Sequence, residues 1–233
     1  MGLPFFDFLT PGMVVFALLM LSIGVSGSLA RETDQGTLTR IKLSTMSSFD
    51  LLFGFLAMWA LVGVVQVLLL FGTGIALGFE WQGGLKSLAF AAGIASISGI
   101  ASVALGLIIA SFARTEGQAN AFTTLITVPM AFLIGSFMPM NTELISRFLP
   151  WGQAGHCMRA LLNAGAPIGL ILPNILWMVL ETVILFAIGV LLYSRLRLRL
   201  GALALGVALL AAVSAVQAQS LSDFEKNTTV HVL

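Results

Sequence analysis

Six long apolar stretches, separated by short polar connections, dominate this sequence of 233 residues. They run over residues 11–30, 51–78, 88–112, 118–138, 171–194 and 201–218. A helix needs roughly 20 mainly apolar residues to cross the hydrocarbon core of a bilayer, where unsatisfied backbone amides are too costly for open structures. The sequence therefore predicts an all-α, polytopic membrane helix bundle with five or six spanning helices.

The composition excludes most soluble classes of protein. Hydrophobic residues make up 58% of the chain and charged residues only 9%, whereas soluble domains are about 25% charged. The net charge is +1, so no basic surface for nucleic acid is predicted. One cysteine and two histidines favour neither a disulfide framework nor a zinc site. We expect no catalytic residue and no bound metal.

The positive charges are distributed unevenly among the connections. Those after the first, third and fifth stretches contain Arg31, Arg40, Lys42, Arg114, Arg195, Arg197 and Arg199. The others contain only Lys86, Arg147 and Arg159. By the positive-inside rule, the first group faces the cytoplasm and residues 1–10 lie outside. We expect a multi-pass protein of the inner (plasma) membrane.

The longest polar run between two apolar stretches covers residues 31–46. Leu38, Ile41 and Thr45 share one face at helical spacing, and most polar side chains fall elsewhere. This pattern indicates a short amphipathic helix at the cytoplasmic surface. Taken alone, the periodicity favours a plainer interpretation, namely a solvated loop or a helix that rests on lipid headgroups.

Four motifs in order resemble the membrane subunit of type-2 ABC exporters. The first is FLTPGM at the start of the first stretch, and the second is RETDQGTLTRIKLS followed by Gly54 at the entry to the next stretch. The third contains Arg114, Thr115, Gln118, Ala119, Pro129, Gly135 and Pro139 in the order expected for the family. The fourth consists of Pro150, Trp151 and Arg159. The resemblance covers residues 5–199.

The resemblance implies a permease subunit that moves an unidentified substrate by alternating access. It also implies three partners: an ABC ATP-binding subunit, a second permease subunit in a homo- or heterodimer, and the lipid bilayer. The run GGLKS at residues 83–87 lacks the glycine-to-lysine spacing of a phosphate-binding loop. We therefore expect no cofactor bound by this chain, with ATP and Mg²⁺ bound through the partner subunit.

In the family, the polar run after the first stretch is the coupling helix that docks on the ATP-binding subunit. The residues that this implies for the contact are Arg31, Glu32, Gln35, Gly36, Thr37, Leu38, Arg40 and Ile41. Two features differ from the family pattern. Phe55 stands where a lysine often follows the glycine, and the usual opening helix, first span and outer loop are missing. We expect residues 1–199 to form an N-terminally incomplete transmembrane domain.

Three polar or helix-breaking residues inside the apolar stretches are candidates for the translocation path or its gate. Glu181 lies about 12 Å along the fifth stretch, where a carboxylate is energetically costly unless it is paired, protonated or exposed to water. It either lines a path or makes a structural contact, with Trp177 one turn earlier as the expected partner. Pro129 should kink the fourth stretch, as a gate or to fit a neighbour, with nearby threonines satisfying freed carbonyls. Gln66 is a weaker candidate because amides commonly bridge helices.

Two further segments allow more than one interpretation. Residues 140–170 are too short and too polar to cross twice, which predicts re-entrant or interfacial helices on the outer face. His156 and Cys157 lie there, but adjacent helical positions diverge by about 100°, which disfavours a catalytic pair. Residues 200–218 form either an extra apolar helix or a signal-peptide-like segment. The polar tail, residues 219–233, faintly resembles the opening of a secreted pitrilysin-type zinc peptidase.

Two other classes of function fit the same spans. A secondary, ion-coupled transporter usually carries several ionisable groups near the midplane and internal repeats; here Glu181 is almost alone and no repeat is evident. A non-transport membrane scaffold would leave residues 31–46 as a solvated loop. The order of the family motifs favours the exporter permease over both.

Overall fold

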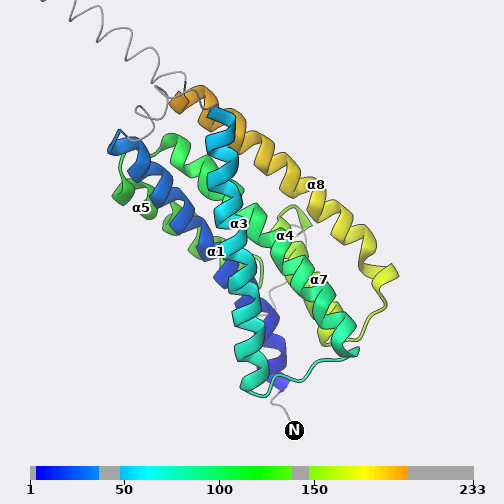
Figure 1. Cartoon of the computed structure of the whole chain (residues 1–233). Helices are drawn as coiled ribbons and strands as arrows, with labels where there is room; N and C mark the ends of the chain where they lie inside the picture. Colours follow the sequence, from blue (N-terminus) through cyan, green and yellow to red (C-terminus); the bar gives the residue numbers. More distant parts are fainter. Residues whose placement is uncertain (1–3, 37–47, 138–146, 199–233) are drawn as a thin grey trace, which may run out of the picture.

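The described part of the chain is entirely helical in the computed structural model, which describes residues 4–36, 48–137 and 147–198. The elements in chain order are α1 (Pro4–Asp34), α3 (Ser48–Ala76), α4 (Gly84–Phe112), α5 (Glu116–Leu133), α7 (Pro150–Leu162), α8 (Ile168–Tyr193) and the short π-helix η1 (Ser194–Leu198). Figure 1 shows long helices that run roughly alongside one another. The predicted all-α bundle is confirmed for these residues.

Four of these helices are long and apolar enough to cross a membrane. The spans are Leu9–Asp34, Phe53–Ala76, Gly84–Phe112 and Ile168–Leu196. They correspond to the first, second, third and fifth predicted stretches. The sixth predicted stretch, residues 201–218, lies outside the described residues.

The fourth predicted stretch forms α5, which is not among those four because its first half is polar. It nevertheless packs against α1 over most of its length. At one end Glu116 pairs with Arg31, and at the other Gly12 lies directly against the backbone of Ser136. About 28 Å of α1 separates Gly12 from Arg31 at 1.5 Å per residue. We conclude that α5 runs antiparallel to α1 through the same depth of the bundle.

The centre of the molecule is made by α1 and α4. The helix α4 packs against α1, α3, α7 and α8. Glycines permit the close approach: a Cβ at Gly106 would lie 2.7 Å from Cβ of Val25 on α1, and one at Gly189 would lie 3.1 Å from the Ala104 carbonyl oxygen. In lipid, where apolar burial drives little association, small residues of this kind bring helices together.

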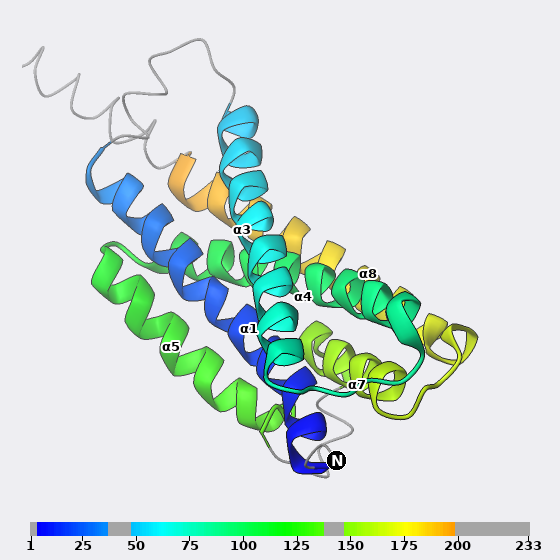
Figure 2. The same ribbon diagram turned by 60° about the horizontal axis from the view of Figure 1, so that its bottom comes forward.

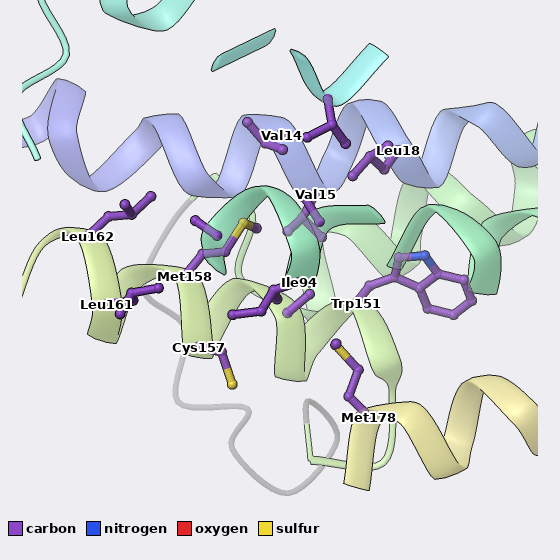
Figure 3. Close-up of a cluster of buried hydrophobic side chains, with 14 of the residues drawn as sticks. Val14, Val15, Leu18, Ile94, Trp151, Cys157, Met158, Leu161, Leu162 and Met178 are labelled. Atoms are coloured by element: carbon purple, nitrogen blue, oxygen red, sulfur yellow. The ribbon is translucent and has the colours of Figure 1, made fainter. Parts of the chain in front are cut away.

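The outer connection contains α7, as residues 140–170 predict, and this helix is largely buried. Trp151, Cys157, Met158 and Leu162 are nearly inaccessible. In Figure 3, Met158 and Leu162 point toward α1, whereas Cys157 points from the opposite side of α7. Trp151 Nε1 donates a hydrogen bond to Ser102 Oγ of α4 at 2.8 Å. Of the two predicted alternatives, this burial favours a re-entrant helix over one lying on the surface.

The helix ends divide into two groups at opposite ends of the bundle. One end holds the close of α1, the start of α3, the α4–α5 connection and η1; the other holds the α3–α4 connection and the close of α7 (Figures 1 and 2). Arg31, Arg114 and Arg195 belong to the first end, and Lys86 to the second. This grouping agrees with the predicted charge asymmetry, so we refer to the first end as cytoplasmic and the second as outer.

Candidate functional site

An ion pair joins the cytoplasmic ends of α1 and α5. Arg31, in the last turn of α1, donates from Nε and Nη2 to the two carboxylate oxygens of Glu116 at 2.7 and 2.6 Å. Such two-pronged contact fits the planar guanidinium and fixes both position and direction. The two side chains are 56% and 38% exposed, so solvent screening keeps the contribution of the pair to stability small. Its geometric effect is to hold the two helix ends together.

A second contact joins the same end of α1 to α8. Thr33 Oγ1 donates to the Leu29 carbonyl oxygen at 2.9 Å and is also hydrogen-bonded to Tyr193 Oη at 3.3 Å. Tyr193 is the only tyrosine in the chain and is fully buried. We call these four residues, Arg31, Thr33, Glu116 and Tyr193, the cytoplasmic contact cluster.

The residues predicted to form the coupling helix are divided by the structure. Arg31 and Glu32 belong to α1 itself, which continues to Asp34, so a separate helix does not begin at residue 31. Gln35 and Gly36 form the turn that closes α1, with Gln35 N–H donating to the Arg31 carbonyl and Gly36 at φ +68°. That left-handed conformation favours glycine. The remaining predicted contact residues, Thr37, Leu38, Arg40 and Ile41, lie outside the described residues.

Glu181 is half-buried on α8, and its side chain lies near that of Trp177, one turn earlier. The second carboxylate oxygen, Oε2, is buried and has no hydrogen-bond partner among the described residues. A buried carboxylate oxygen without a donor is unfavourable. Glu181 therefore remains a candidate for contact with substrate, water or another chain.

Pro129 lies inside α5 with its ring exposed, but the threonines around it do not act as predicted. Because Pro129 has no N–H, the carbonyl of Leu125 loses its helical partner. Thr123, Thr124 and Thr127 donate instead to the carbonyls of Ala119, Asn120 and Thr123. Each hydroxyl bonds one turn back from its own position, as threonine does inside helices.

Gln66 connects two helices. Its Nε2 donates to the Ala17 carbonyl oxygen at 3.0 Å, from α3 to α1. Sequence reasoning missed a second inter-helix bond, between Ser26 Oγ of α1 and Thr123 Oγ1 of α5 at 2.7 Å. Beside it, a Cβ at Gly27 would meet Asn120 of α5. The small residues Gly24, Ser26, Gly27 and Ser28 of α1 are the sequence signal that could have indicated this close polar contact.

No group of three potential metal ligands comes together within the described ranges. Cys157 is buried, and burial raises the pKa of its thiol to about 11. At the outer end, Arg159 Nη2 donates to the Gly135 carbonyl oxygen at 2.5 Å, which joins α7 to the close of α5. This contact adds to the packing of α7 against α1, α4 and α8.

Comparisons with known proteins agree with the motifs. A family described as ABC-2 family transporter protein matches residues 3–191. Nodulation protein J of Rhizobium meliloti (strain 1021) is 28% identical over 180 residues, which cover 72% of this chain and 65% of that protein. The linearmycin resistance permease protein LnrN of Bacillus subtilis (strain 168) is 23% identical over 152 residues, covering 62% of this chain and 38% of that protein. No solved structure matches the chain.

The chain spans less than two thirds of the length of these two relatives. The comparisons do not support the predicted signal peptide or the peptidase-like tail, and residues 199–233 lie outside the described part of the chain. The family match covers most of the chain and all the motifs that carried the resemblance. It also covers three of the four residues of the cytoplasmic contact cluster, all but Tyr193. This protein therefore belongs to the ABC-2 family of transporter proteins.

Proposed function

We propose that the chain is the permease subunit of an ATP-driven exporter of the inner membrane. Its partners would be a separate ABC ATP-binding subunit and a second permease subunit, and ATP with Mg²⁺ would be bound by the ATP-binding subunit. The observation that carries the proposal is the cytoplasmic contact cluster. It joins the end of α1, which leads into the polar run at residues 37–46, to both α5 and α8.

The cluster supplies a physical route for coupling. An ATP-binding subunit that grips residues 35–41 would displace the end of α1. Because Arg31 holds Glu116 and Thr33 contacts Tyr193, α5 and α8 would move with it. Packed helices exchange between discrete arrangements rather than deforming gradually, so such a displacement would switch the bundle between inward-open and outward-open states.

The outward-facing side of α5 is the surface that we assign to the translocation path. Gln118, Thr124 and Pro129 are exposed there, beside apolar residues such as Leu125. Polar side chains are unfavourable against lipid tails, so this face suits contact with water or a second permease copy. Pro129 would then be the gating residue on α5, Glu181 a path residue on α8, and Gln66 a contact that keeps α3 on α1.

The test is whether an ATPase accompanies the chain. We would purify the tagged full chain in mild detergent from membranes of the cell that encodes it and measure Mg²⁺-dependent, vanadate-sensitive ATP hydrolysis. The wild-type chain should carry that activity. Leu38→Asp, which places a charge on the predicted docking face, should lose it.

Lys86→Gln is the matched control, because Lys86 is an exposed cation at the outer end. It should retain the ATPase activity in full. Wild-type chain without any associated ATPase, or equal activity in Leu38→Asp and Lys86→Gln, would contradict the proposal. A secondary transporter or a scaffold would give the first of these results.

A further inference from the structure

An apolar groove runs between α4 and α8 in the outer half of the bundle. Its volume is about 340 Å³, and its described lining consists of apolar side chains and Gly93. Phe90 of α4 and Leu172 of α8 line it and are 47% and 48% exposed. The described helices therefore leave the groove open on one side.

The packing of the two helices places the groove in the outer leaflet. Both begin at the outer end, and Gly189 of α8 lies against Ala104 of α4, each about 20 residues beyond the start of its helix. The helices therefore run in parallel at the same depth. On α4 the lining ends at Ile97, about 20 Å from the helix start at 1.5 Å per residue. Since the outer half of a hydrocarbon core is about 15 Å thick, the groove lies in the outer leaflet and reaches about the midplane.

A smaller cavity adjoins the groove on the side of the membrane surface. Its volume is about 170 Å³, and Lys86 and Gly165 are among its lining residues. Ile168, at the start of α8, lines both cavities, so they are neighbours. The Gln82 N–H donates to the Leu162 carbonyl oxygen at 2.8 Å, which holds the α3–α4 connection against the close of α7. The smaller cavity thus lies among the outer connections, at the level of the lipid headgroups.

Lys86 is the only charged side chain in the described lining of either cavity. It is exposed and has no ion-pair partner within the described ranges. Phe90, Gly93 and Ile97 follow it at intervals of four, seven and eleven residues, which places all four on one face of α4. The ammonium group therefore belongs to the same helix face as the groove, at its outer mouth.

The position of the groove decides what fills it. Water is excluded at this depth, and an empty groove would forfeit the dispersion contacts of its lining. An acyl chain of the surrounding bilayer meets both conditions. Gly93 leaves room for it, because a Cβ at this position would meet nothing within 4 Å. The cation at the mouth then distinguishes among lipids, because a lysine near the membrane surface attracts anionic headgroups.

We propose that α4 and α8 bind an anionic phospholipid of the outer leaflet, with an acyl chain in the groove and the phosphate at Lys86. The groove holds the chain by its shape, and Lys86 selects the headgroup by its charge. The cytoplasmic contact cluster lies at the opposite end of the bundle, so this proposal does not depend on ATP-driven export.

The experiment places a tryptophan in the groove of the full chain. Phe90→Trp and the wild type are reconstituted into phosphatidylcholine nanodiscs that contain a small fraction of either phosphatidylglycerol or phosphatidylcholine with brominated acyl chains, which quench nearby indoles. The difference between the two proteins is the signal of the new indole. At equal mole fraction, brominated phosphatidylglycerol should quench this signal about fivefold more effectively, as one lysine–anion contact at a membrane surface predicts.

Variants of Lys86 in the Phe90→Trp chain test the headgroup contact. Lys86→Gln should abolish the preference for phosphatidylglycerol, and Lys86→Arg should keep most of it because the charge stays. Arg114→Gln is the matched control, because it removes an exposed cation at the cytoplasmic end, and it should leave the preference unchanged. Equal quenching by both lipids in the Phe90→Trp chain, as for a groove covered by a second copy, or a preference that survives Lys86→Gln, overturns the proposal.

A variant of Gly93 tests the groove itself. Gly93→Leu in the Phe90→Trp chain fills the groove and should remove the preference although Lys86 is intact. The matched control is Gly72→Leu on α3, where an added Cβ also meets nothing within 4 Å, and it should keep the preference. A preference that survives Gly93→Leu would reduce the site to a headgroup contact and overturn the proposal.

Two further arms separate this proposal from its neighbours. Excess inorganic phosphate, compared with chloride at matched ionic strength, should leave the preference intact because the acyl chain contributes to binding. Displacement by phosphate would assign the smaller cavity to a soluble anion and overturn the lipid proposal. Leu38→Asp, which should lose the associated ATPase, should retain the lipid preference, so the failure of one proposal is distinguishable from the failure of the other.

Discussion

The helices α1 and α4 differ sharply from α3 and α8, although all four are apolar enough to span a membrane. In the most apolar part of α1 and of α4, 61% of residues are buried, against 17% in α3 and in α8. The difference follows residue size: α4 is rich in Gly, Ala and Ser, whereas α3 and α8 expose Leu, Val and Phe or Ile side chains. Apolar character takes a helix into the bilayer, and small residues then decide which helices lie at the centre.

The strongest test of that comparison is to add volume at the centre. In Gly106→Leu, the new Cβ would lie 2.7 Å from Cβ of Val25 and 2.8 Å from the Ser22 carbonyl oxygen, both on α1. Because α1 and α4 would have to separate, we expect the free energy of unfolding to fall by more than about 3 kcal/mol. The measurement is the yield of monodisperse protein in gel filtration. Gly93→Leu on the same helix is the control, since an added Cβ there meets nothing within 4 Å. Similar yields for both variants would mean that α1 and α4 are not closely packed.

Cys157 reports on whether α7 is as enclosed as α1 and α4. Burial raises the pKa of its thiol to about 11, so the reactive thiolate is scarce at neutral pH and increases only as the pH approaches that value. We expect maleimide labelling at neutral pH to be roughly a hundredfold slower than for an exposed cysteine. The comparison is Leu85→Cys in a Cys157→Ser chain, because Leu85 is 78% exposed at the outer end. Equal labelling rates in the folded protein would place α7 on the surface.

Removing side-chain volume should also destabilise the central helices more than the peripheral ones, with smaller effects than adding volume. Leu107 on α4 is fully buried, whereas Leu68 on α3 is 62% exposed. Leu107→Ala should lower the free energy of unfolding by about 2 kcal/mol through the cavity that it leaves, and Leu68→Ala by less than about 0.5 kcal/mol. Titration with SDS, followed by circular dichroism, measures both. A larger loss for Leu68→Ala would indicate that α3 contributes a core surface.

The smallest effect is expected where the two regions meet. Gln66 on α3 donates to the Ala17 carbonyl oxygen of α1 at 3.0 Å, and inter-helix hydrogen bonds in membranes are worth about 0.6 kcal/mol on average. Gln66→Leu should lower the free energy of unfolding by about that amount in the same SDS titration. Val65→Leu, at the exposed neighbouring position, is the control. No difference between the two variants would show that this bond does not help to hold α3 on α1.

The long apolar helices could be predicted from the sequence, because an uncharged run of about 20 apolar residues has few alternatives in a bilayer. The helical outer connection could also be predicted, from a segment too short to cross twice. The burial of α7 could not, because the same residues suit a helix that lies at the interface. Its burial depends on long-range contacts such as Trp151 with Ser102.

The candidate site was harder to predict than the fold, for the same reason. Arg31 and Glu32 lie in a polar run that local patterning assigns to a separate helix, yet α1 continues through them to Asp34. The partners of the cytoplasmic contact cluster are 85 and 160 residues apart in sequence, and no local periodicity carries that information. For Pro129, local sequence reasoning was wrong in another way. Nearby threonines were expected to donate to the carbonyl that the proline leaves without a partner, but they donate to carbonyls four residues before their own positions.

The central claim is that the cytoplasmic contact cluster transmits nucleotide-driven movement from α1 to α5. The direct measurement is the maleimide labelling rate of Leu125→Cys, on the exposed face of α5, in a Cys157→Ser chain in native membranes, with and without ATP and vanadate. We predict a nucleotide-dependent change in rate that disappears in Glu116→Arg and returns when Arg31→Glu is added, because the double variant restores the ion pair in reverse. A rate that responds to nucleotide equally in Glu116→Arg, or no recovery in the double variant, would contradict the account.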